Sequence, residues 1–350
     1  MAKTIYDLIV QKENRLMLEQ ILDFSFLIRQ GINEASKINN SIIKKCDVSI
    51  DTIHWYGMGA SALVGEYLKY YLQYSSEQGP NITINRNHKL RHRDGSLYVF
   101  YSYSGNTKET IMVLRKAVEE IPKERIITFS SGGIMKEIAE KNGILNIRLP
   151  EGYVSRSHLP FGIGASVAVL ANIFKLRDML EDLKRVADEI EKKYMGEYTN
   201  NGQMINSIAL RLSKRIAIIL TDYTLKPVAM RFMAQLNENS KHFSAFFEVP
   251  EGCHNFIVGM RNIWKKSFIV IVRRESEDSF ISKTMDILEG MLSRVDSLKF
   301  VIKDGGKYSW ITLLKPTLFI DILSVFTADI KGENAFDIAE IRAIKESYGG

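Results

Sequence analysis

The sequence predicts an α/β protein made of two units, each a parallel sheet flanked by helices in a doubly wound arrangement. Short apolar runs alternate with amphipathic stretches along most of the 350 residues, which is the pattern of strands joined by helical crossovers. A similar order of strand-like and helix-like segments returns from about residue 205. The chain is also long enough for about two domains that share a sizeable buried core.

The first half begins with a helical segment over about residues 14–40. Five apolar runs then predict strands: IDTIHWYG, NITIN, SLYVFYSYS, RIITFSS and ILNIRL. The stretches between them predict helices: SALVGEYLKYYL, TKETIMVLRKAVEEI and GIMKEIAEKNG. Residues 160–180, PFGIGASVAVLANIFKLRDML, predict one long and mostly buried helix, and the charged stretch EDLKRVADEIEKKYMGEY predicts another.

The second half follows TNNGQ, which is predicted to be a linker. Its strands are predicted at RIAIILTD, AFFEV, SFIVIVRRE and LKFVIKDG, and its helices at KPVAMRFMAQLNENSK, SFISKTMDILEGMLSRV and LKPTLFIDILSVFTADIK. The repeated order indicates a distant structural duplication, without a repeat at the level of residues.

The composition excludes several classes of protein. The net charge of +6 and the pI of about 9.0 come from basic residues that are interleaved with 41 acids, so we expect no nucleic-acid partner. The densest basic stretch, NRNHKLRHR at residues 85–93, lacks the alternating aromatic residues of a single-strand binder and is predicted to be a connection.

Cysteine usage and hydropathy fit a reducing interior. The two cysteines, Cys46 and Cys253, form no disulfide framework, and no clustered Cys/His spacing predicts a metal site. The N-terminal stretch MAKTIYDLIVQKENRLMLEQ is interrupted by charges, and no later run approaches the ~18 apolar residues of a membrane span. We therefore expect a cytoplasmic protein without a membrane partner.

Two turns could hold an anion. The strand IDTIHWYG runs into GMGASALVGEY, where Gly57 and Gly59 allow a tight turn and Ser61 lies near the start of the next helix. Free amides at a helix start favour a bound anion. Together with Ala62 the two glycines also satisfy the G-x-G-x-x-A dinucleotide pattern. NITINRNHK supplies no acid for a ribose, although Arg86 would suit NADP, so a nucleotide stays open as an alternative.

The second turn is SYSGNT, which directly follows an apolar strand and precedes a helix. Its three hydroxyl residues are Ser102, Ser104 and Thr107, and a solvated serine-rich loop is the simplest interpretation of the turn taken alone. Because the carboxyl ends of parallel strands meet at one edge, these hydroxyls and Ser61 could converge on one phosphate. The first strand of the second half ends in TDYTLKP instead, so we expect one such site per chain.

The combination GMGASALVGEY and SYSGNTKET resembles the sugar isomerase (SIS) domain. The segments QLNENSK, PEGCHN and SRSHLPFG are similar to the catalytic and arginine-bearing segments of the bifunctional phosphoglucose/phosphomannose isomerase family, found mainly in archaea. The resemblance runs from about residue 50 to the end of the chain. The sixteen-residue offset between Glu238 and His254 makes it more specific than a single SIS turn.

The resemblance implies two SIS subdomains of flavodoxin-like topology. It divides the chain into a helical segment at residues 1–45, a phosphate-binding domain at 46–180, a helical linker at 181–204 and a catalytic domain at 205–350. It further implies a homodimer without cofactor or metal that binds a sugar phosphate. The phosphate would be held by Gly59, Ser61, Ser102, Ser104 and Thr107.

The resemblance also implies catalytic roles. Glu238 would be the base that moves a proton between C1 and C2 through an enediol. His254 would open the sugar ring, and in the family this histidine comes from the partner subunit. Arg156 would stabilise the enediolate, and Lys345, on a predicted final helix, belongs to the same site.

Two positions depart from the family pattern. Ser155 precedes Arg156 where a proline is expected, and Ile338 occupies the position of a threonine that is tied to acceptance of both C2 epimers. Mannose 6-phosphate as a substrate is therefore left open, beside the isomerisation of glucose 6-phosphate and fructose 6-phosphate.

Two further functions remain as alternatives: a non-catalytic sugar-phosphate sensor and an amino-sugar-phosphate isomerase. The joint presence of Glu238 and His254 favours the hexose phosphate isomerase over a sensor. The roughly 50 residues before the first strand are expected to be too short for a helix-turn-helix domain, and no glutaminase domain with a cysteine nucleophile is expected.

Overall fold

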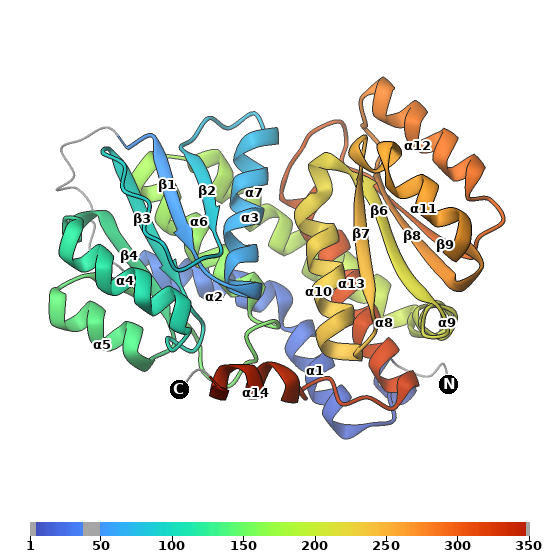
Figure 1. Ribbon diagram of the computed structural model, residues 1–350, viewed down its shortest axis with the longest axis horizontal. Helices are drawn as coiled ribbons and strands as arrows, with labels where there is room; N and C mark the ends of the chain where they lie inside the picture. Colours follow the sequence, from blue (N-terminus) through green and yellow to red (C-terminus); the bar gives the residue numbers. More distant parts are fainter. Residues whose placement is uncertain (1–4, 38–49, 348–350) are drawn as a thin grey trace. The chain divides into compact units, whose positions relative to one another are not determined.

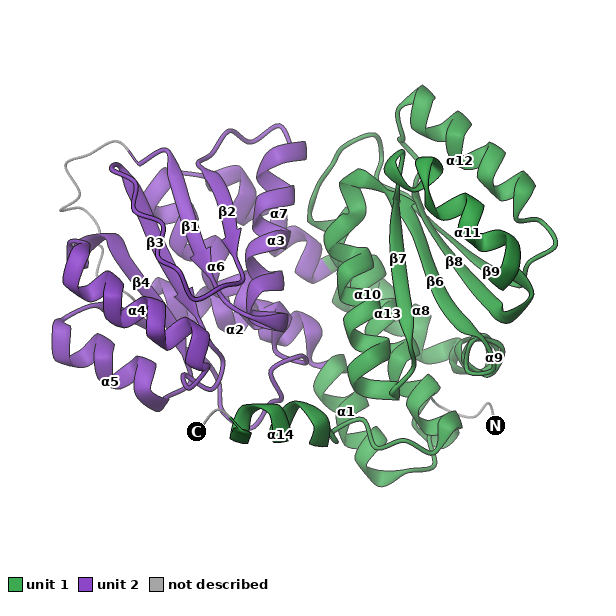
Figure 2. Ribbon diagram, in the orientation of Figure 1, with its two compact units in different colours: residues 1–22, 189–349 green, residues 23–188, 350 purple. Residues whose placement is uncertain are grey.

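The computed structural model describes residues 5–37 and 50–347 and divides the chain into two compact units (Figures 1 and 2). Unit 1 comprises Met1–Leu22 and Glu189–Gly349, and unit 2 comprises Asp23–Asp188. This grouping differs from the four segments expected from the sequence, which stay a prediction about domain organisation. Cys46 and the end of the predicted helical segment lie outside the described residues.

Unit 2 contains a five-stranded parallel sheet in the order β2-β1-β3-β4-β5. Strands β1, β3 and β4 are buried at every position, and helices on both faces explain their continuous apolar sequences. The five strands predicted in this half are confirmed: β1 (Thr52–Tyr56), β2 (Asn81–Asn85), β3 (Ser96–Tyr101), β4 (Ile126–Ser130) and β5 (Leu145–Arg148).

The helices of unit 2 cover both faces of this sheet. Figure 1 shows α4 and α5 on one face, and α3, α6 and α2 on the other. The predicted helix over residues 160–180 is wrong in its length, because α6 ends at Phe174 and Lys175 adopts a left-handed conformation before α7 starts. The helices are α2 (Phe24–Ser36), α3 (Gly59–Tyr74), α4 (Lys108–Glu120), α5 (Gly133–Asn142), α6 (Leu159–Phe174) and α7 (Arg177–Glu189).

Two glycines set the packing of α2 against α6. A Cβ atom on Gly164 would lie 2.2 Å from the carbonyl oxygen of Ile28, and one on Gly31 would lie 2.3 Å from that of Phe161. Both distances are far below a real contact, so the helix backbones touch only because neither residue has a side chain.

Unit 1 contains a four-stranded parallel sheet in the order β7-β6-β8-β9. In chain order this is second, first, third, fourth, which is the arrangement of the first four strands of unit 2. The predicted duplication is therefore present in the topology. The strands are β6 (Ile216–Asp222), β7 (Ser244–Val249), β8 (Ser267–Arg274) and β9 (Ser297–Ile302).

The predicted linker at TNNGQ is wrong. Helix α8 ends at Asn200 and α9 begins at Gly202, so only Asn201 lies between them. Tertiary packing overrides the turn-like composition, because Gly202 is buried against Ile5 and the next turns of α9 enter the core. The helices of unit 1 are α1 (Lys12–Leu22), α8 (Met195–Asn200), α9 (Gly202–Leu212), α10 (Lys226–Ser240), α11 (Phe256–Ile263), α12 (Ser279–Met291), α13 (Trp310–Lys331) and α14 (Ala339–Ser347).

Helix α13 is the core helix of unit 1. Among the described helices it has the length and apolar composition of a membrane span, yet its apolar window is wholly buried in the protein. It packs against α1, α9 and α10. The expectation that no later run approaches the length of a membrane span is therefore wrong for this segment. Lys315 and Asp321 interrupt its apolar run, but its average composition is still apolar enough.

The N-terminal helices are held by different units. The backbone amides of Val10 and Gln11 each donate to the Asp329 carboxylate at 2.9 Å, which fixes the start of α1 against α13. At the start of α2, the Tyr153 hydroxyl donates to Asp23 at 2.7 Å within unit 2. These contacts explain why the chain divides between residues 22 and 23.

We predict that Gly164→Ala destabilises the protein by about 3 kcal/mol, because the added methyl group meets the backbone of α2 and cannot be accommodated by a rotamer change. The control is Gly290→Ala on α12, where a Cβ has no atom within 4 Å; it should gain roughly 0.5 to 1 kcal/mol in helix propensity. Urea unfolding of both variants measures the difference. Equal midpoints would contradict the glycine-mediated packing.

Candidate active site

The carboxyl edge of the unit 2 sheet has a topological switch point between β1 and β3. These strands are neighbours, with Tyr56 opposite Phe100. The helices that follow them, α3 and α4, lie on opposite faces of the sheet (Figure 1). Ligands of open parallel sheets bind in the crevice that forms at such a point. The two turns predicted to hold an anion, GMGAS and SYSGNT, follow these two strands.

The SYSGNT turn brings two of its three hydroxyl groups together. The side-chain oxygens of Ser102 and Thr107 lie 2.8 Å apart, and the Gly105 amide donates to the Ser102 carbonyl at 3.0 Å. Ser104 is exposed, and its hydroxyl accepts from the Asn106 amide at 3.2 Å. Thr107 precedes the first residue of α4 without capping it, so its hydroxyl faces the Ser102 hydroxyl.

The next turn along the sheet braces SYSGNT. Gly105 has φ +69°, and a Cβ there would lie 1.8 Å from the Gly132 carbonyl oxygen. The Asn106 side chain accepts from the Ile134 amide at 3.0 Å, and Ser131 donates to the Tyr103 carbonyl at 2.7 Å. Sequence reasoning missed this brace, although a glycine pair directly after the strand RIITFSS was a usable signal.

The GMGAS turn lies against the same strand end. Gly59 has φ +50°, and a Cβ on Gly57 would lie 3.1 Å from the Tyr101 carbonyl oxygen. Ser61 is 7% exposed in the first turn of α3, and the Trp55 indole donates to its carbonyl at 3.0 Å. The two turns therefore both lie at the carboxyl end of β3, beside Tyr101, whereas the convergence of their hydroxyl groups on one phosphate stays a prediction. The nucleotide alternative loses its cation, since Arg86 forms an ion pair with Glu66 at 2.8 Å.

His158 connects the arginine-bearing loop to this strand end. One ring nitrogen, Nδ1, lies 2.6 Å from the Ser155 carbonyl oxygen and must carry a proton to bond with it. In the neutral ring Nε2 then accepts from the Tyr101 hydroxyl at 2.8 Å. Burial raises the pKa of Tyr101 well above its usual value, which keeps this donor protonated. Arg156 is 2% exposed. In sequence it lies between Ser155 and His158, whose contacts hold the loop in place.

Helix α10 carries Glu238 in its last turn and is fixed in rotation by α13. The Arg231 guanidinium donates to both oxygens of Asp321, at 2.9 and 2.7 Å, and the Gln235 amide donates to the same carboxylate at 2.9 Å. One turn later, Asn239 donates to Ser324 at 2.9 Å. Arg231 and Asp321 are almost fully buried, whereas Glu238 is half-buried.

Within unit 1 the structure does not bring Glu238 and His254 together. Three residues after the end of α10 lead into β7, so Glu238 lies at the amino edge of the sheet. His254 is exposed in a short 3-10 turn, Glu251–His254, that follows the carboxyl end of β7. A six-residue strand spans roughly 20 Å, so the two side chains lie at opposite edges.

Lys345 and Ile338 lie near the end of the chain. Helix α14, which carries Lys345, contains no buried residue, and Ile338 directly precedes it. Lys345 itself is exposed.

Ion pairs occupy the switch point of unit 1, between β6 and β8. Asp222 at the end of β6 accepts from the Thr224 amide at 2.6 Å, and burial raises its pKa. At the end of β8, Arg274 pairs with Asp304 at 2.7 Å and Arg273 pairs with Glu277 at 2.7 Å. This edge thus presents acids and paired arginines where unit 2 presents hydroxyl groups.

Comparisons with known proteins agree with this architecture. Residues 48–150 match the SIS domain model, and residues 203–347 match the model of the bacterial phospho-glucose isomerase C-terminal SIS domain. A bifunctional phosphoglucose/phosphomannose isomerase from Aeropyrum pernix is 30% identical over 86% of this chain and 90% of its own length. A D-glucosamine-6-phosphate 4-epimerase from Sulfolobus acidocaldarius is 29% identical over 63% of this chain and 68% of its own.

A solved structure shares the fold. The C-terminal domain of glucosamine-fructose-6-phosphate aminotransferase from Francisella tularensis aligns with a TM-score of 0.68 at 19% identity, over 90% of this chain and 96% of that one. The match spans both units, so the predicted class of two SIS-type parallel sheets is confirmed.

We predict that Tyr101→Phe weakens binding of inorganic phosphate roughly five- to tenfold, because His158 loses its partner and no longer ties the arginine loop to the strand end. The matched control is Tyr98→Phe on the same strand, which loses hydrogen bonds to the Arg93 backbone at 2.9 and 3.2 Å. Calorimetric titration of both variants gives the comparison. The same weakening in the control would show that the effect is general destabilisation.

Proposed function

The chain belongs to the bifunctional phosphoglucose/phosphomannose isomerase family, and we propose that it interconverts glucose 6-phosphate and fructose 6-phosphate by proton transfer through an enediol. The observation that carries this proposal is the hydroxyl-lined switch point of unit 2, where Ser102 and Thr107 lie 2.8 Å apart at the start of α4. The pattern is that of a phosphate site built from neutral donors and helix-start amides. We further propose a cytoplasmic enzyme that works without a cofactor.

The phosphate group would occupy the crevice between the two turns. The Ser61, Ser102, Ser104 and Thr107 hydroxyls and the amides near Gly59 would donate to its oxygens. Because these donors are uncharged, most of the attraction would come from hydrogen bonds and the aligned amides of α3 and α4. The brace from Gly132 keeps the turn in place before substrate arrives, which reduces the ordering cost of binding.

Glu238 would move the proton between C1 and C2. A carboxylate suits this proton transfer because one oxygen can reach both carbons from the same side of the enediol. A general base of this kind contributes roughly 10² to 10⁴ in rate. The buried contacts of Arg231 and Gln235 with Asp321 support this role, since they fix the rotation of α10 about its axis. A fixed base has less orientational freedom to lose in the transition state.

Arg156 would stabilise the negative charge of the enediolate. Two hydrogen bonds of His158, one to the Ser155 carbonyl and one with the Tyr101 hydroxyl, support this assignment. They order the loop that carries Arg156 beside the SYSGNT turn. A preoriented guanidinium interacts with developing charge without reorganising during the reaction. Lys345 would join the site from α14.

His254 would open the sugar ring and act on a substrate bound to the partner subunit. An acid or base must come within about 3 Å of the atom it protonates, and one chain holds Glu238 and His254 at opposite edges of the β7 sheet. We therefore propose a homodimer in which each active site combines Glu238 of one subunit with the histidine of the other. An isologous two-fold arrangement creates two equal sites.

The substrate range is the second part of the proposal. Ile338 replaces the threonine linked to acceptance of both C2 epimers, so we expect glucose 6-phosphate to be preferred over mannose 6-phosphate. The similarity to a D-glucosamine-6-phosphate 4-epimerase favours one alternative, an amino-sugar phosphate as substrate.

We predict that the wild type forms fructose 6-phosphate from glucose 6-phosphate and that Glu238→Gln lowers the rate by roughly 10² to 10⁴. The control is Glu275→Gln, an exposed residue of unit 1 that should leave the rate unchanged. A coupled assay measures fructose 6-phosphate formed from glucose 6-phosphate and from mannose 6-phosphate, supplied separately, and NMR follows the conversion of glucosamine 6-phosphate to any other amino-sugar phosphate. Turnover of the amino sugar alone would replace the hexose phosphate proposal, and an unaffected Glu238→Gln would remove Glu238 as the base.

We predict that mixing the inactive variants Glu238→Gln and His254→Ala restores activity. Subunit exchange produces mixed dimers with one intact site each, so about a quarter of the wild-type activity should return at equal concentrations. The mixture is assayed after incubation at a concentration that allows exchange, beside each variant alone. If dimers exchange, as mass spectrometry can verify, and no activity returns, then Glu238 and His254 act in the same chain.

A further inference from the structure

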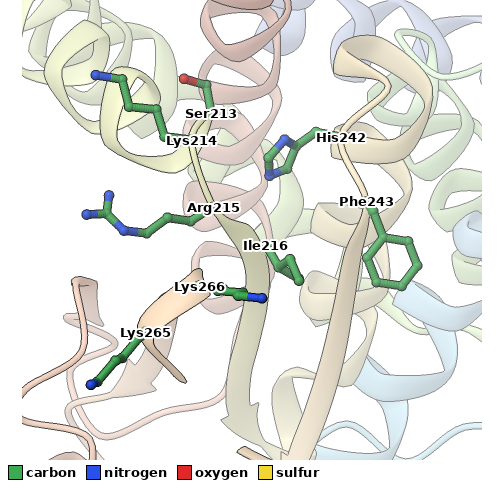
Figure 3. A pocket seen from close by; sticks show the side chains of 8 residues that line it. All are labelled: Ser213, Lys214, Arg215, Ile216, His242, Phe243, Lys265 and Lys266. Atoms are coloured by element: carbon green, nitrogen blue, oxygen red, sulfur yellow. The ribbon is translucent and has the colours of Figure 1, made fainter. Parts of the chain in front are cut away.

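A pocket at the amino edge of the unit 1 sheet is not used by the proposed reaction. It has a volume of about 580 Å³ and is formed by residues that directly precede or begin β6, β7 and β8. Its lining residues are Ser213, Lys214, Arg215, Ile216, His242, Phe243, Lys265 and Lys266. Figure 3 shows these side chains coming from three segments that meet at the strand starts. The volume lies within the range of small-molecule sites.

The charge of this pocket is one-sided. Four of its lining residues are cationic and none is acidic. Arg215 forms an ion pair with Asp296 at 2.9 Å. Lys214, Lys265 and Lys266 have no ion pair in the part of the chain that the structure describes, although Lys37, Lys116 and Lys184 on the surface each pair with a nearby glutamate. The positive charges of these lysines repel one another, and a bound anion would offset this repulsion.

His242 provides an independent observation. The residue is 6% exposed, and its Nε2 has no hydrogen-bond partner among the described residues. Figure 3 shows the ring directed toward the segment that begins β6. Burial and the nearby Lys331 lower its pKa to about 4, although a hydrogen bond to the Arg215 backbone opposes this shift, so the ring is neutral at pH 7. Buried polar atoms are nearly always satisfied, so this nitrogen beside the pocket is a polar atom that still lacks a partner.

Phe243 indicates what else the ligand carries. Its side chain is 71% exposed although it lies beside the buried His242. An exposed aromatic ring next to clustered lysines can stack on a flat ring while the lysines hold phosphates. Lysine suits such a site because it binds phosphate as a point charge.

We propose that this pocket binds a small molecule with two or more clustered phosphate charges. It would be a second anion site, on the other unit from the sugar-phosphate turns. The ligand would contact the segment between α10 and β7, only a few residues after Glu238, at the point where Lys331 donates to the carbonyls of Ser240 and Lys241 at 2.9 and 2.8 Å. Occupancy would thus act on the helix end that carries the proposed base.

The test is calorimetric titration of the full chain with tripolyphosphate, which needs no isomerase activity. We expect saturable binding at this pocket that is at least tenfold weaker in Lys265→Ala/Lys266→Ala, whether or not tripolyphosphate also binds at the unit 2 turns. The matched control is Lys192→Ala/Lys283→Ala, two exposed lysines of unit 1 outside the pocket, which should bind as the wild type does. Equal affinity in the two double variants, or no binding by the wild type, would overturn the proposal.

A further arm separates the two anion sites. Ser104→Ala, on the unit 2 turn, should keep tripolyphosphate binding; if it loses binding while Lys265→Ala/Lys266→Ala keeps it, the ligand belongs to the sugar-phosphate turn and the proposal fails. ATP serves as a second probe. Tighter binding of ATP than of tripolyphosphate, lost in Phe243→Ala, identifies a nucleotide-like ligand, and equal binding of both probes identifies the phosphate chain as the recognised part.

Discussion

The order in which the strands pair is the constraint on which the unit 2 site depends. Because β1 lies between β2 and β3, α3 and α4 leave the sheet on opposite faces and open a crevice between their starts. Backbones must then approach closely. A Cβ on Gly57 would crowd the Tyr101 carbonyl at the end of β3, and one on Gly105 would collide with the Gly132 carbonyl in the neighbouring turn. The glycines thus allow the backbones at the strand ends to approach closely, and the hydroxyl groups of the SYSGNT turn lie at this edge.

Unit 1 shows that strand order alone does not make an anion site. Its sheet repeats the order, but the equivalent point between β6 and β8 holds Asp222 and the arginines at the end of β8. A buried carboxylate repels an anion, and Arg274 is already paired with Asp304, which has no exposed side-chain surface. Such pairs add little net stability because desolvation offsets most of the attraction. Their effect is to close this edge to a second phosphate.

Much of the fold could be predicted because the information is local. Strands buried on both faces appear as continuous apolar runs, and the glycine-rich turn after β1 and the hydroxyl-rich turn after β3 stand out in the sequence. The prediction of a linker at TNNGQ failed because the helical state of this segment depends on the packing of Gly202 against Ile5, nearly two hundred residues away in sequence. Composition cannot report such a contact.

The positioning contacts of the site were out of reach of sequence for the same reason. Tyr101 and His158 are 57 residues apart, and Arg231 and Asp321 are 90 apart. No local pattern marks either pair. The turn and the proposed base could be named from motifs, whereas the side chains that hold them in place became visible only when distant segments were brought together.

The parallel sheet of unit 1 also imposes a requirement on assembly. In a helix followed by a parallel strand, the end of the helix and the end of the strand lie at opposite edges of the sheet. Glu238 lies at the end of helix α10, and His254 follows the end of strand β7. The length of β7 therefore separates them, whatever the length of the connection between α10 and β7. A chemistry that needs both groups on one sugar must draw them from two sheets. On the proposed roles, two copies related by a two-fold axis would satisfy this with one kind of contact used twice.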